Sequence, residues 1–273
     1  MIVFPAAKIN LGLYVTDRRN DGYHNIETLF YPIGLTDILE LVPAPELGSG
    51  NIEITLSGIY VEGNAESNLV VKAYRMVHES VSLPGVKAFL HKCIPTGAGL
   101  GGGSSDGAFM LKLLSRVFGL GLTADELFAM ALSLGSDCPF FLESKPSLAR
   151  GRGEMLTAAP FLLKGCYIQL FHPGTGISTA AAYRNVPVGP PDVSLDVIAN
   201  GPVSEWKGAM KNSFEKYAFE QQPVIGQIKE SLYRAGALYS SMTGSGSAVF
   251  GLFDRETPTP SDISRYLIWK EIL

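Results

Sequence analysis

The sequence has 273 residues, of which 46% are hydrophobic and 18% charged, and its formal net charge is −4. A chain of this length can bury a sizeable core in one large domain or two modest ones. The slightly negative charge argues against nucleic acid or an anionic membrane as a partner, and no apolar run approaches the roughly 18 residues that a membrane helix needs.

The N-terminus and the cysteines predict a cytoplasmic protein with free thiols. Residues 1–8 have no basic region before their apolar part, so we expect no signal peptide. Cys93, Cys138 and Cys166 are odd in number and far apart, which suits a reducing cytoplasm. A zinc site is not expected, because the sequence has no C-x-x-C pair and only four histidines.

Short β-prone runs, separated by Gly, Pro, Asn and Asp, fill the first third of the chain. They predict strands over residues 2–4, 9–15, 37–42 and 51–56. A helix is expected over 67–80, with Ser67 as its N-cap, because apolar residues recur there at helical spacing. A strand over 86–92 follows and leads into a glycine-rich segment.

The rest of the chain mixes helices and strands without a regular strand–helix–strand rhythm. Thr123 to Glu126 form a predicted capping box before a helix over 127–134, and Gly135 stands at its C-cap position. We expect strands over 165–171, 239–242 and 248–253, a helix over 224–234, and a surface loop over 187–202. The pattern predicts an α+β protein. Because Gly151, Gly153 and Pro160 interrupt the pattern, we expect one domain over 1–155 and a second over 156–273.

Residues 94–106, Ile-Pro-Thr-Gly-Ala-Gly-Leu-Gly-Gly-Gly-Ser-Ser-Asp, are the most informative segment. They lie between an apolar stretch and a helix-like run over 108–118. Glycine lets a ligand approach the bare backbone, and a helix N-terminus adds unpaired N–H donors and partial positive charge. The segment therefore predicts a phosphate site.

Three familiar phosphate loops do not fit this segment. A dinucleotide-binding loop needs a second strand with an acid roughly 20 residues later, but Asp125 falls in a helix-start signal. A protein-kinase loop needs a V-A-I-K-type lysine and an H-R-D segment, and the sequence has neither. A Walker loop needs Gly-Lys-Ser/Thr, whereas this chain has Gly103-Ser104-Ser105.

The remaining pattern, Pro-x-Gly-x-Gly-Leu-Gly-Gly-Gly-Ser-Ser, resembles the second motif of the GHMP kinases, the superfamily of galactokinase and of homoserine, mevalonate and phosphomevalonate kinases. Residues 5–11 resemble the superfamily's first motif, and residues 242–250 resemble its third. The matches keep a consistent order over nearly the whole chain. The resemblance implies a two-domain fold, with a ribosomal-protein-S5-like N-terminal domain and a ferredoxin-like C-terminal domain.

Three further segments resemble a narrower branch of this superfamily. They are Asp21-Gly22-Tyr23-His24, residues 134–141 and Asn212-Ser213-Phe214-Glu215. The branch uses ATP and Mg²⁺ to phosphorylate the 2-hydroxyl of 4-diphosphocytidyl-2-C-methyl-D-erythritol in non-mevalonate isoprenoid synthesis, without a covalent enzyme intermediate. The resemblance therefore implies a small-molecule partner that carries cytidine diphosphate.

The resemblance also implies which residues form the site. Asp137 is expected to be the general base and Lys8 the cation beside it. The expected ATP-binding residues are Lys92, Pro95, Gly97, Ala98, Gly99, Leu100, Gly101, Gly102, Gly103, Ser104 and Ser105. The expected substrate-binding residues are Asn10, Tyr23, His24, Asp137, Thr179 and Tyr183, with Tyr23 and Tyr183 on opposite faces of the cytosine. Gly244, Ser245 and Gly246 are expected to form a turn near the phosphates.

Several alternatives stay open at this level. The superfamily commonly has Asn where this chain has Asp106, which is expected either to cap the helix or to contact magnesium through water. Ser105 and Asp106 are the candidate magnesium ligands, while the two serines could instead cap the helix, and Lys92 could be a solvated lysine. Other candidate functions are a homoserine- or mevalonate-type kinase and a non-catalytic ligand sensor. The oligomeric state is not predicted.

Overall fold

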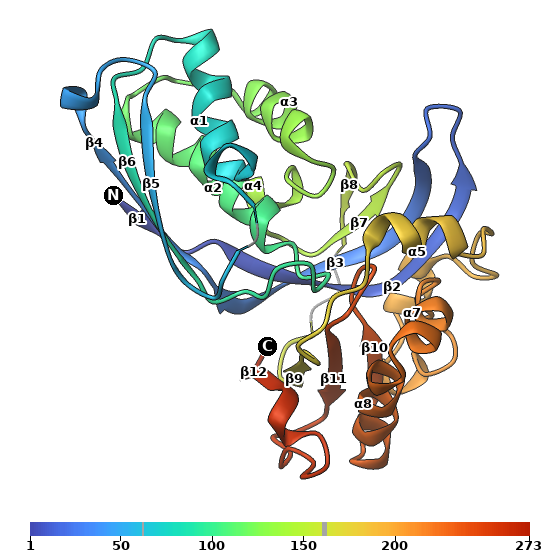
Figure 1. The fold of residues 1–273 in the computed structure, drawn as a ribbon. Helices are drawn as coiled ribbons and strands as arrows, with labels where there is room; N and C mark the ends of the chain where they lie inside the picture. The colour runs from blue at the N-terminus through green and yellow to red at the C-terminus, as the bar shows by residue number, and fades with distance from the viewer. Residues whose placement is uncertain (62, 160–162) are drawn as a thin grey trace. The chain divides into compact units, whose positions relative to one another are not determined.

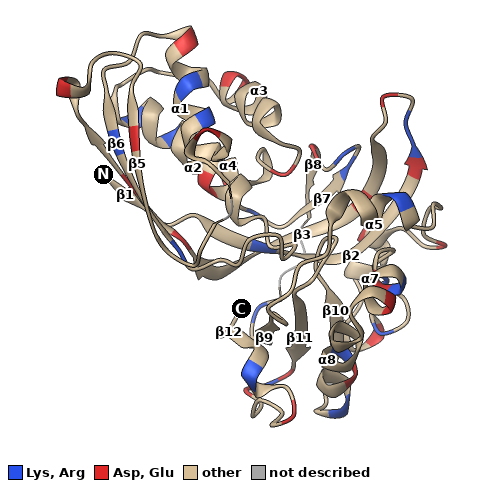
Figure 2. Cartoon of the chain, viewed as in Figure 1, with Lys and Arg blue, Asp and Glu red and all other residues tan. Residues whose placement is uncertain are grey.

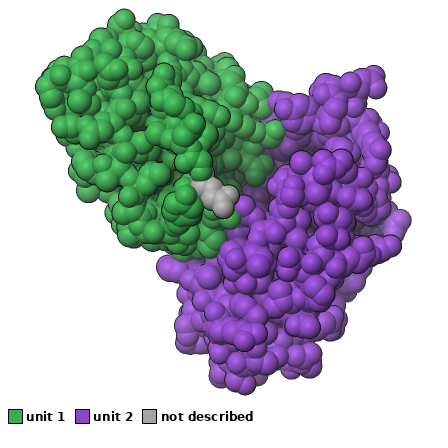
Figure 3. Space-filling model, viewed as in Figure 1, with its two compact units in different colours: residues 1–7, 34–96, 101–144 green, residues 8–33, 97–100, 145–273 purple. Residues whose placement is uncertain are grey.

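The computed structural model describes residues 1–61, 63–159 and 163–273 (Figure 1). The chain forms two compact units, each built from separate stretches of sequence (Figure 3). Unit 1 comprises residues 1–7, 34–96 and 101–144, and unit 2 comprises residues 8–33, 97–100 and 145–273. These units follow packing rather than sequence order, so they divide the chain differently from the predicted domains at 1–155 and 156–273. Pro160, which helped to suggest that boundary, lies outside the described residues.

Unit 1 is a sheet with helices on one face. The strand order is β1 (Ile2–Val3), β4 (Ile38–Pro43), β6 (Val86–Lys92) and β5 (Ile52–Gly58). The β5–β6 pair is parallel and the other two pairs are antiparallel. The helices α1 (Leu69–Ser80), α2 (Gly102–Val117), α3 (Ala124–Leu134) and α4 (Phe140–Glu143) gather on one side of this sheet (Figure 1). In β6, Val86, Ala88 and Leu90 alternate with less buried residues, as expected of a strand with one face on a core.

Unit 2 contains two further sheets and the C-terminal helices. One sheet has the order β2 (Ala6–Arg18), β3 (His24–Thr36), β7 (Ser147–Arg150) and β8 (Met155–Ala158), although the first residues of β2 and the last of β3 belong to unit 1. The other has the order β10 (Tyr239–Met242), β11 (Val249–Phe253), β9 (Tyr167–Phe171) and β12 (Leu267–Ile272). The helices are α5 (Thr179–Asn185), α6 (Leu195–Ala199), α7 (Glu215–Gln221) and α8 (Pro223–Arg234).

The second sheet and the C-terminal helices share one core. Phe171 and Val249 of the sheet, Ile225 and Leu232 of α8, and Phe214 before α7 belong to the same buried cluster. Helix α8 buries one face only: its buried residues Ile225, Ile228 and Leu232 recur at helical spacing, and Glu230 and Arg234 are exposed. Figure 2 shows acidic and basic residues interspersed over the chain, which agrees with its small net charge.

Several local predictions are confirmed. Strand β6 has the predicted bounds, and β4, β5, β9, β10 and β11 lie within about two residues of theirs. The capping box is present in full: Thr123 accepts a hydrogen bond from the Glu126 backbone, and the Glu126 carboxylate accepts one from Thr123. Gly135 is the C-cap of α3, but its φ of 171° is extended rather than left-handed. The mixed-sheet α+β class is also confirmed.

Four local predictions differ from the structure. The long strand β3 was missed, because most of it is buried on both faces and therefore lacks alternation. Asn68, not Ser67, caps α1. Helix α2 begins at Gly102, six residues before the expected run. The prediction missed this first turn because glycine has a low helix propensity. Residues 187–202, expected to be a loop, contain α6.

No helix among the described residues combines the length and the apolar character that crossing a bilayer requires.

The capping box makes a stability prediction. We expect Thr123→Ala to lower the free energy of unfolding by about 1 kcal/mol, because it leaves an N-terminal donor of α3 without its partner. Ser133→Ala is the control, since Ser133 in the same helix bonds only the Ala129 carbonyl, and it should have little effect. Urea denaturation of both variants measures the difference, and equal stabilities would contradict the role of the cap.

Candidate active site

The glycine-rich segment ends in an open helix N-terminus in unit 1. Gly101 is the N-cap of α2, with a left-handed φ of 72° that favours glycine. The first intrahelical bond joins the Ser105 N–H to the Gly101 carbonyl at 2.9 Å, so the preceding amides have no partner in the helix. The described residues provide no side-chain cap here. A Cβ at Gly103 would meet nothing within 4 Å, which leaves the first turn open to an anion.

Lys92 is not a solvated lysine but the centre of a buried charge cluster in unit 1. Its ammonium donates to the Asp37 carboxylate and, at 2.7 Å, to Asp106. Asp37 also accepts the backbone N–H groups of Cys93 and Ile94, at 2.6 and 2.9 Å. Asp37 therefore ties Lys92 to the start of the glycine segment. It was not predicted as a site residue, because one aspartate beside a strand carries no distinguishing pattern.

Asp106 lies in the second turn of α2 and does not cap the helix, so the capping prediction is wrong. Burial raises the pKa of its carboxyl to about 7, although the nearby Lys92 ammonium opposes the shift. Two carboxylates share one ammonium in this cluster, so a proton on Asp106 restores charge balance. The water-mediated magnesium contact stays a prediction.

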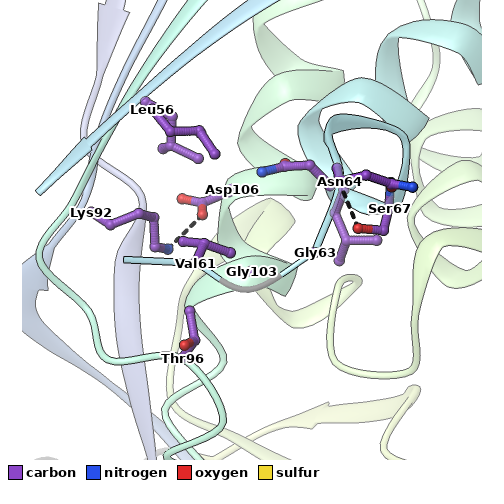
Figure 4. A pocket seen from close by; sticks show the side chains of 12 residues that line it. Leu56, Val61, Gly63, Asn64, Ser67, Lys92, Thr96, Gly103 and Asp106 are labelled. Carbon is purple, nitrogen blue, oxygen red and sulfur yellow. Dashed lines mark hydrogen bonds and ion pairs between the residues drawn. The ribbon is translucent and has the colours of Figure 1, made fainter. Parts of the chain in front are cut away.

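A pocket of about 160 Å³ lies against this cluster (Figure 4). Lys92, Thr96, Gly103 and Asp106 line it next to the charge cluster. The remaining lining residues are Leu56, Val61, Gly63, Asn64, Ser67, Asn68, Leu69 and Leu90. Figure 4 shows Asp106 and Lys92 facing each other beside Gly103. Apolar walls with a few amide and charged groups suit a flat, polar-edged ligand.

Asp137 lies in the short connection between α3 and α4, near the first turn of α2. The next residue, Cys138, is fully buried. Burial raises the pKa of its thiol to about 12, and the nearby Ser104 side chain opposes the shift. Within unit 1, the segment that carries Asp137 therefore lies close to the helix terminus that was predicted to hold phosphate.

Lys8 belongs to a buried hydrogen-bond network in unit 2. Its ammonium donates to Asn10 Oδ1 at 2.6 Å and to the Gly99 carbonyl at 3.1 Å. The Asn10 amide donates to the Thr28 hydroxyl at 2.8 Å. Thr243 accepts the Asn10 N–H at 3.0 Å, and its hydroxyl lies 3.0 Å from the Gly99 carbonyl and 3.2 Å from Asn10 Oδ1. These contacts, which we call the Lys8 network, join the first, second and third motifs.

Close packing of two backbones also holds the second-motif segment around Gly99 against the third-motif turn. Gly99, with φ 79°, lies so close to the third-motif turn that a Cβ would overlap the Thr243 carbonyl. A Cβ at Gly244 would lie 2.9 Å from the Gly99 Cα. The Ala248 N–H donates to the Ala98 carbonyl at 3.1 Å. Gly99 and Gly244 are thus required by the close approach of two backbones, in addition to any ligand.

The predicted cytosine-binding residues cluster in unit 2. The rings of His24 and Tyr183 are 5.1 Å apart and tilted by 31°, and Tyr183 also contacts Phe214 edge-on. Tyr23 is 54% exposed, with the Arg152 guanidinium 4.8 Å from its ring centroid. His24 Nε2 is buried without a hydrogen-bond partner among the described residues. The structure brings His24 and Tyr183 together, but the cytosine sandwich by Tyr23 and Tyr183 stays a prediction.

The predicted turn and its neighbours also lie in unit 2. The Ser245 hydroxyl is 3.0 Å from that of Thr179, a predicted substrate residue. Gly246 has a left-handed φ of 100°. Thr243 and Thr28 were missed as site residues. Thr243 lies inside the recognised third motif and had that signal, whereas Thr28 stands in the strand that was not predicted.

The two predicted magnesium ligands, Ser105 and Asp106, each have one buried oxygen that could bind the ion. Ser105 Oγ and Asp106 Oδ1 are both buried without hydrogen-bond partners among the described residues. One hydroxyl and one carboxylate oxygen suit Mg²⁺, which is commonly held by few protein ligands together with substrate phosphates. Where the chain is described, no three His, Cys, Asp or Glu side chains gather into a metal site. A preformed all-protein cage is therefore not seen in that part of the chain.

Comparison with known proteins gives the family. The model of the GHMP kinases N terminal domain matches residues 68–145, and that of the GHMP kinases C terminal domain matches residues 195–262. A 4-diphosphocytidyl-2-C-methyl-D-erythritol kinase from Bacteroides thetaiotaomicron is 48% identical over 95% of this chain and 94% of its own. A kinase of the same name from Porphyromonas gingivalis is 48% identical over 94% and 93%.

Solved structures agree with this comparison. A crystal structure of a 4-(cytidine 5'-diphospho)-2C-methyl-D-erythritol kinase has a TM-score of 0.76 and 35% identity, and the match covers 93% of this chain and 91% of that one. Methanococcus jannaschii mevalonate kinase has a TM-score of 0.66 at 14% identity, covering 92% and 90%, and shares the fold alone. The chain belongs to the GHMP kinases and, within them, to the family of 4-diphosphocytidyl-2-C-methyl-D-erythritol kinases.

The close approach at Gly99 makes a prediction. Gly97 and Gly99 both have left-handed φ, but a Cβ at Gly97 would meet nothing within 4 Å. We expect Gly97→Ala to cost about 1–2 kcal/mol of unfolding free energy from backbone strain. Gly99→Ala should cost clearly more, because its methyl overlaps the Thr243 carbonyl. Denaturant titration compares the two, and equal costs would contradict a role for this contact.

The charge cluster predicts a pH effect on stability. The folded-state pKa of Asp106, about 7, lies above its ordinary value of 3.8, so the folded chain holds the extra proton between these values. Stability should therefore fall as pH rises from about 4 to 7, by at most roughly 1.4 kcal/mol per pH unit from this group. Asp106→Asn should remove that fall.

Urea denaturation from pH 5 to pH 8 in magnesium-free buffer measures this effect. Relative to the parent, the variant should gain stability as the pH rises from 5 to about 7, and the difference should then stay constant up to pH 8. Asp125→Asn, an exposed substitution in α3, is the control and should leave the parental pH profile in place. A parent and an Asp106→Asn variant with parallel profiles would show that Asp106 does not hold the proton.

Proposed function

We propose that this chain transfers the γ-phosphoryl group of ATP to the 2-hydroxyl of 4-diphosphocytidyl-2-C-methyl-D-erythritol, in isoprenoid precursor synthesis by the non-mevalonate route. The observation that carries the proposal is the 48% identity to kinases named for this substrate, over more than nine-tenths of both chains. The homoserine- and mevalonate-type alternatives share only the fold, at 18% and 14% identity. ATP dependence is a property of the family as a whole.

The nucleotide site of this proposal is in unit 1. The open first turn of α2 offers N–H donors and partial positive charge to the phosphates. The pocket beside Gly103, with its apolar walls and amide groups, then suits the base. Lys92 contributes positive charge to the lining of this pocket, although both carboxylates of its cluster compensate it. Ser105 and Asp106 are the proposed contacts of Mg²⁺, which would neutralise phosphate charge when bound.

Asp137 is the proposed base. Its carboxylate takes the proton of the acceptor hydroxyl while the hydroxyl oxygen forms a bond to the γ-phosphorus and the bond to the β-phosphate oxygen breaks, releasing ADP. The proximity of Cys138 to Ser104 supports this assignment, because Asp137 is the residue next to Cys138 and Ser104 lies in the first turn of α2. Lys8 is proposed to stabilise the developing negative charge.

The acceptor site of the proposal is in unit 2. Tyr23 and Tyr183 are proposed to contact the faces of the cytosine, and His24 its edge, for which the unpartnered Nε2 is suited. Asn10 is proposed to contact the acceptor near Lys8. Thr179, which is bonded to Ser245, is proposed as a further substrate contact. The protein is proposed to act in the cytoplasm on small molecules, without nucleic acid or membrane partners.

Steady-state kinetics with ATP and three acceptors test the proposal. The expected result is turnover of 4-diphosphocytidyl-2-C-methyl-D-erythritol and none of homoserine or mevalonate, with ADP release lost when EDTA removes Mg²⁺. Asp137→Asn should lower kcat by about 10²–10⁴-fold with little change in KM. The control Asp125→Asn makes the same substitution on α3 and should keep the parental kcat. Parental turnover by Asp137→Asn would refute the base, and turnover of homoserine or mevalonate alone would refute the substrate.

A further inference from the structure

The Asn212–Glu215 segment, Asn-Ser-Phe-Glu, has no role in the proposed chemistry, yet it is built against the third-motif turn in unit 2. Asn212 is only 4% exposed and precedes α7. Its amide nitrogen donates to the carbonyls of Met242 and Gly244, at 2.8 and 2.9 Å. Its amide oxygen accepts the Phe214 N–H at 3.0 Å. Both amide protons are thus used, and each goes to a carbonyl beside Thr243.

Glu215 holds the same turn from the strand side. One carboxylate oxygen accepts the Met242 N–H at 3.0 Å and the Ser241 hydroxyl at 3.2 Å. The other oxygen accepts the Lys229 ammonium at 2.7 Å. Met242 is therefore fixed through its N–H by Glu215 and through its carbonyl by Asn212. Hydrogen bonds with one charged partner are the stronger kind, so this end of the turn is firmly held.

The segment is also fastened to the strand that carries Lys8. The Leu13 N–H donates to the Lys211 carbonyl, and the Ser213 N–H donates to the Leu13 carbonyl, both at 2.8 Å. Strand β2 thus contains Lys8 and Asn10, and a few residues later its Leu13 bonds the segment that contains Asn212. The residue held between them is Thr243, whose hydroxyl contacts Asn10 and Gly99.

We infer that Asn212 and Glu215 are positioning residues for phosphoryl transfer: they fix the two carbonyls and the N–H around Thr243, and thereby the Lys8 network. This inference rests on the proposed function, because it assigns the two residues to the same reaction. They touch neither ATP nor acceptor in this role. A small displacement of a positioned cation can cost about 10²-fold in rate, so the inferred effect falls on kcat.

The test compares Asn212→Ala and Glu215→Gln with Glu27→Gln. Glu27 is a matched control, because its carboxylate likewise accepts a backbone N–H, from Leu195, and pairs with a cation, Arg150. We expect each of the first two variants to lower kcat per folded enzyme by about 10- to 100-fold, with KM for both substrates little changed. The control should keep kcat near the parental value. A merely structural role would lower the folded fraction and leave kcat of the folded enzyme unchanged.

A double-mutant cycle tests the route through Thr243. Thr243→Val removes the hydroxyl with little change in shape. If Glu215 acts through Thr243, the double variant Glu215→Gln/Thr243→Val should lose no more kcat than the single variant with the larger loss. Losses in kcat that multiply would overturn the inference, as would control-like kcat in both single variants. Should Asn212→Ala fail to fold, Asn212→Ser and Glu215→Gln carry the same test.

Hydrogen–deuterium exchange separates this inference from the proposed function. In the free protein, Asn212→Ala and Glu215→Gln should speed exchange in peptides covering residues 97–100 and 242–248, whereas Glu27→Gln should not. If the parent failed to phosphorylate the cytidine compound but exchange still rose, the proposed function would fall and the positioning contact would stand. If the parent were active and neither exchange nor kcat responded, the inference alone would fall.

Discussion

The contact on which the candidate site depends is the approach of Gly99 to the backbone of Thr243 and Gly244. No Cβ fits at Gly99, and the Thr243 hydroxyl lies within hydrogen-bond distance of the Gly99 carbonyl and of Asn10. Three segments from residues 8–10, 97–100 and 242–248 therefore share one small, buried volume. Because Lys8 donates to two members of this group, the position of its ammonium follows from this packing. A buried polar network of this kind stabilises one arrangement only when its members are satisfied.

Unit 1 contains a buried cluster of one basic and two acidic side chains. The cluster of Lys92, Asp37 and Asp106 is buried, so burial opposes every charge in it and the Asp106 pKa rises to about 7. The cluster lies under the first turn of α2 and at one side of the pocket. The Lys92 ammonium is thereby held in place by two acids, and Asp37 also fixes the backbone that enters the glycine segment.

Most regular elements outside the glycine segment could be predicted, because amphipathic periodicity and capping signals are local. Strand β6 and the capping box of α3 are examples. Strand β3 and the first turn of α2 could not, since full burial removes alternation and glycine conceals a helix start. The site residues divide in the same way, into those that a local pattern reveals and those that only distant contacts reveal. Lys8 and Asp137 came from motifs, whereas the contacts of Thr28, Asp37 and Asn212 depend on partners 18 to 57 residues away in sequence.

The sequence by itself determined the family, and it predicted the phosphate site at residues 94–106 and the residues proposed for catalysis, because short motifs in a consistent order carry this information. Only the tertiary structure decided why particular glycines are required, where the Lys92 charge is compensated, and which backbone groups Asn212 and Glu215 bond. Those properties arise from contacts between segments distant in the chain, such as Asn212 with Gly244 and Gly99 with Thr243. A local pattern cannot encode them, since the energy of a buried hydrogen bond depends on where its partner lies after folding.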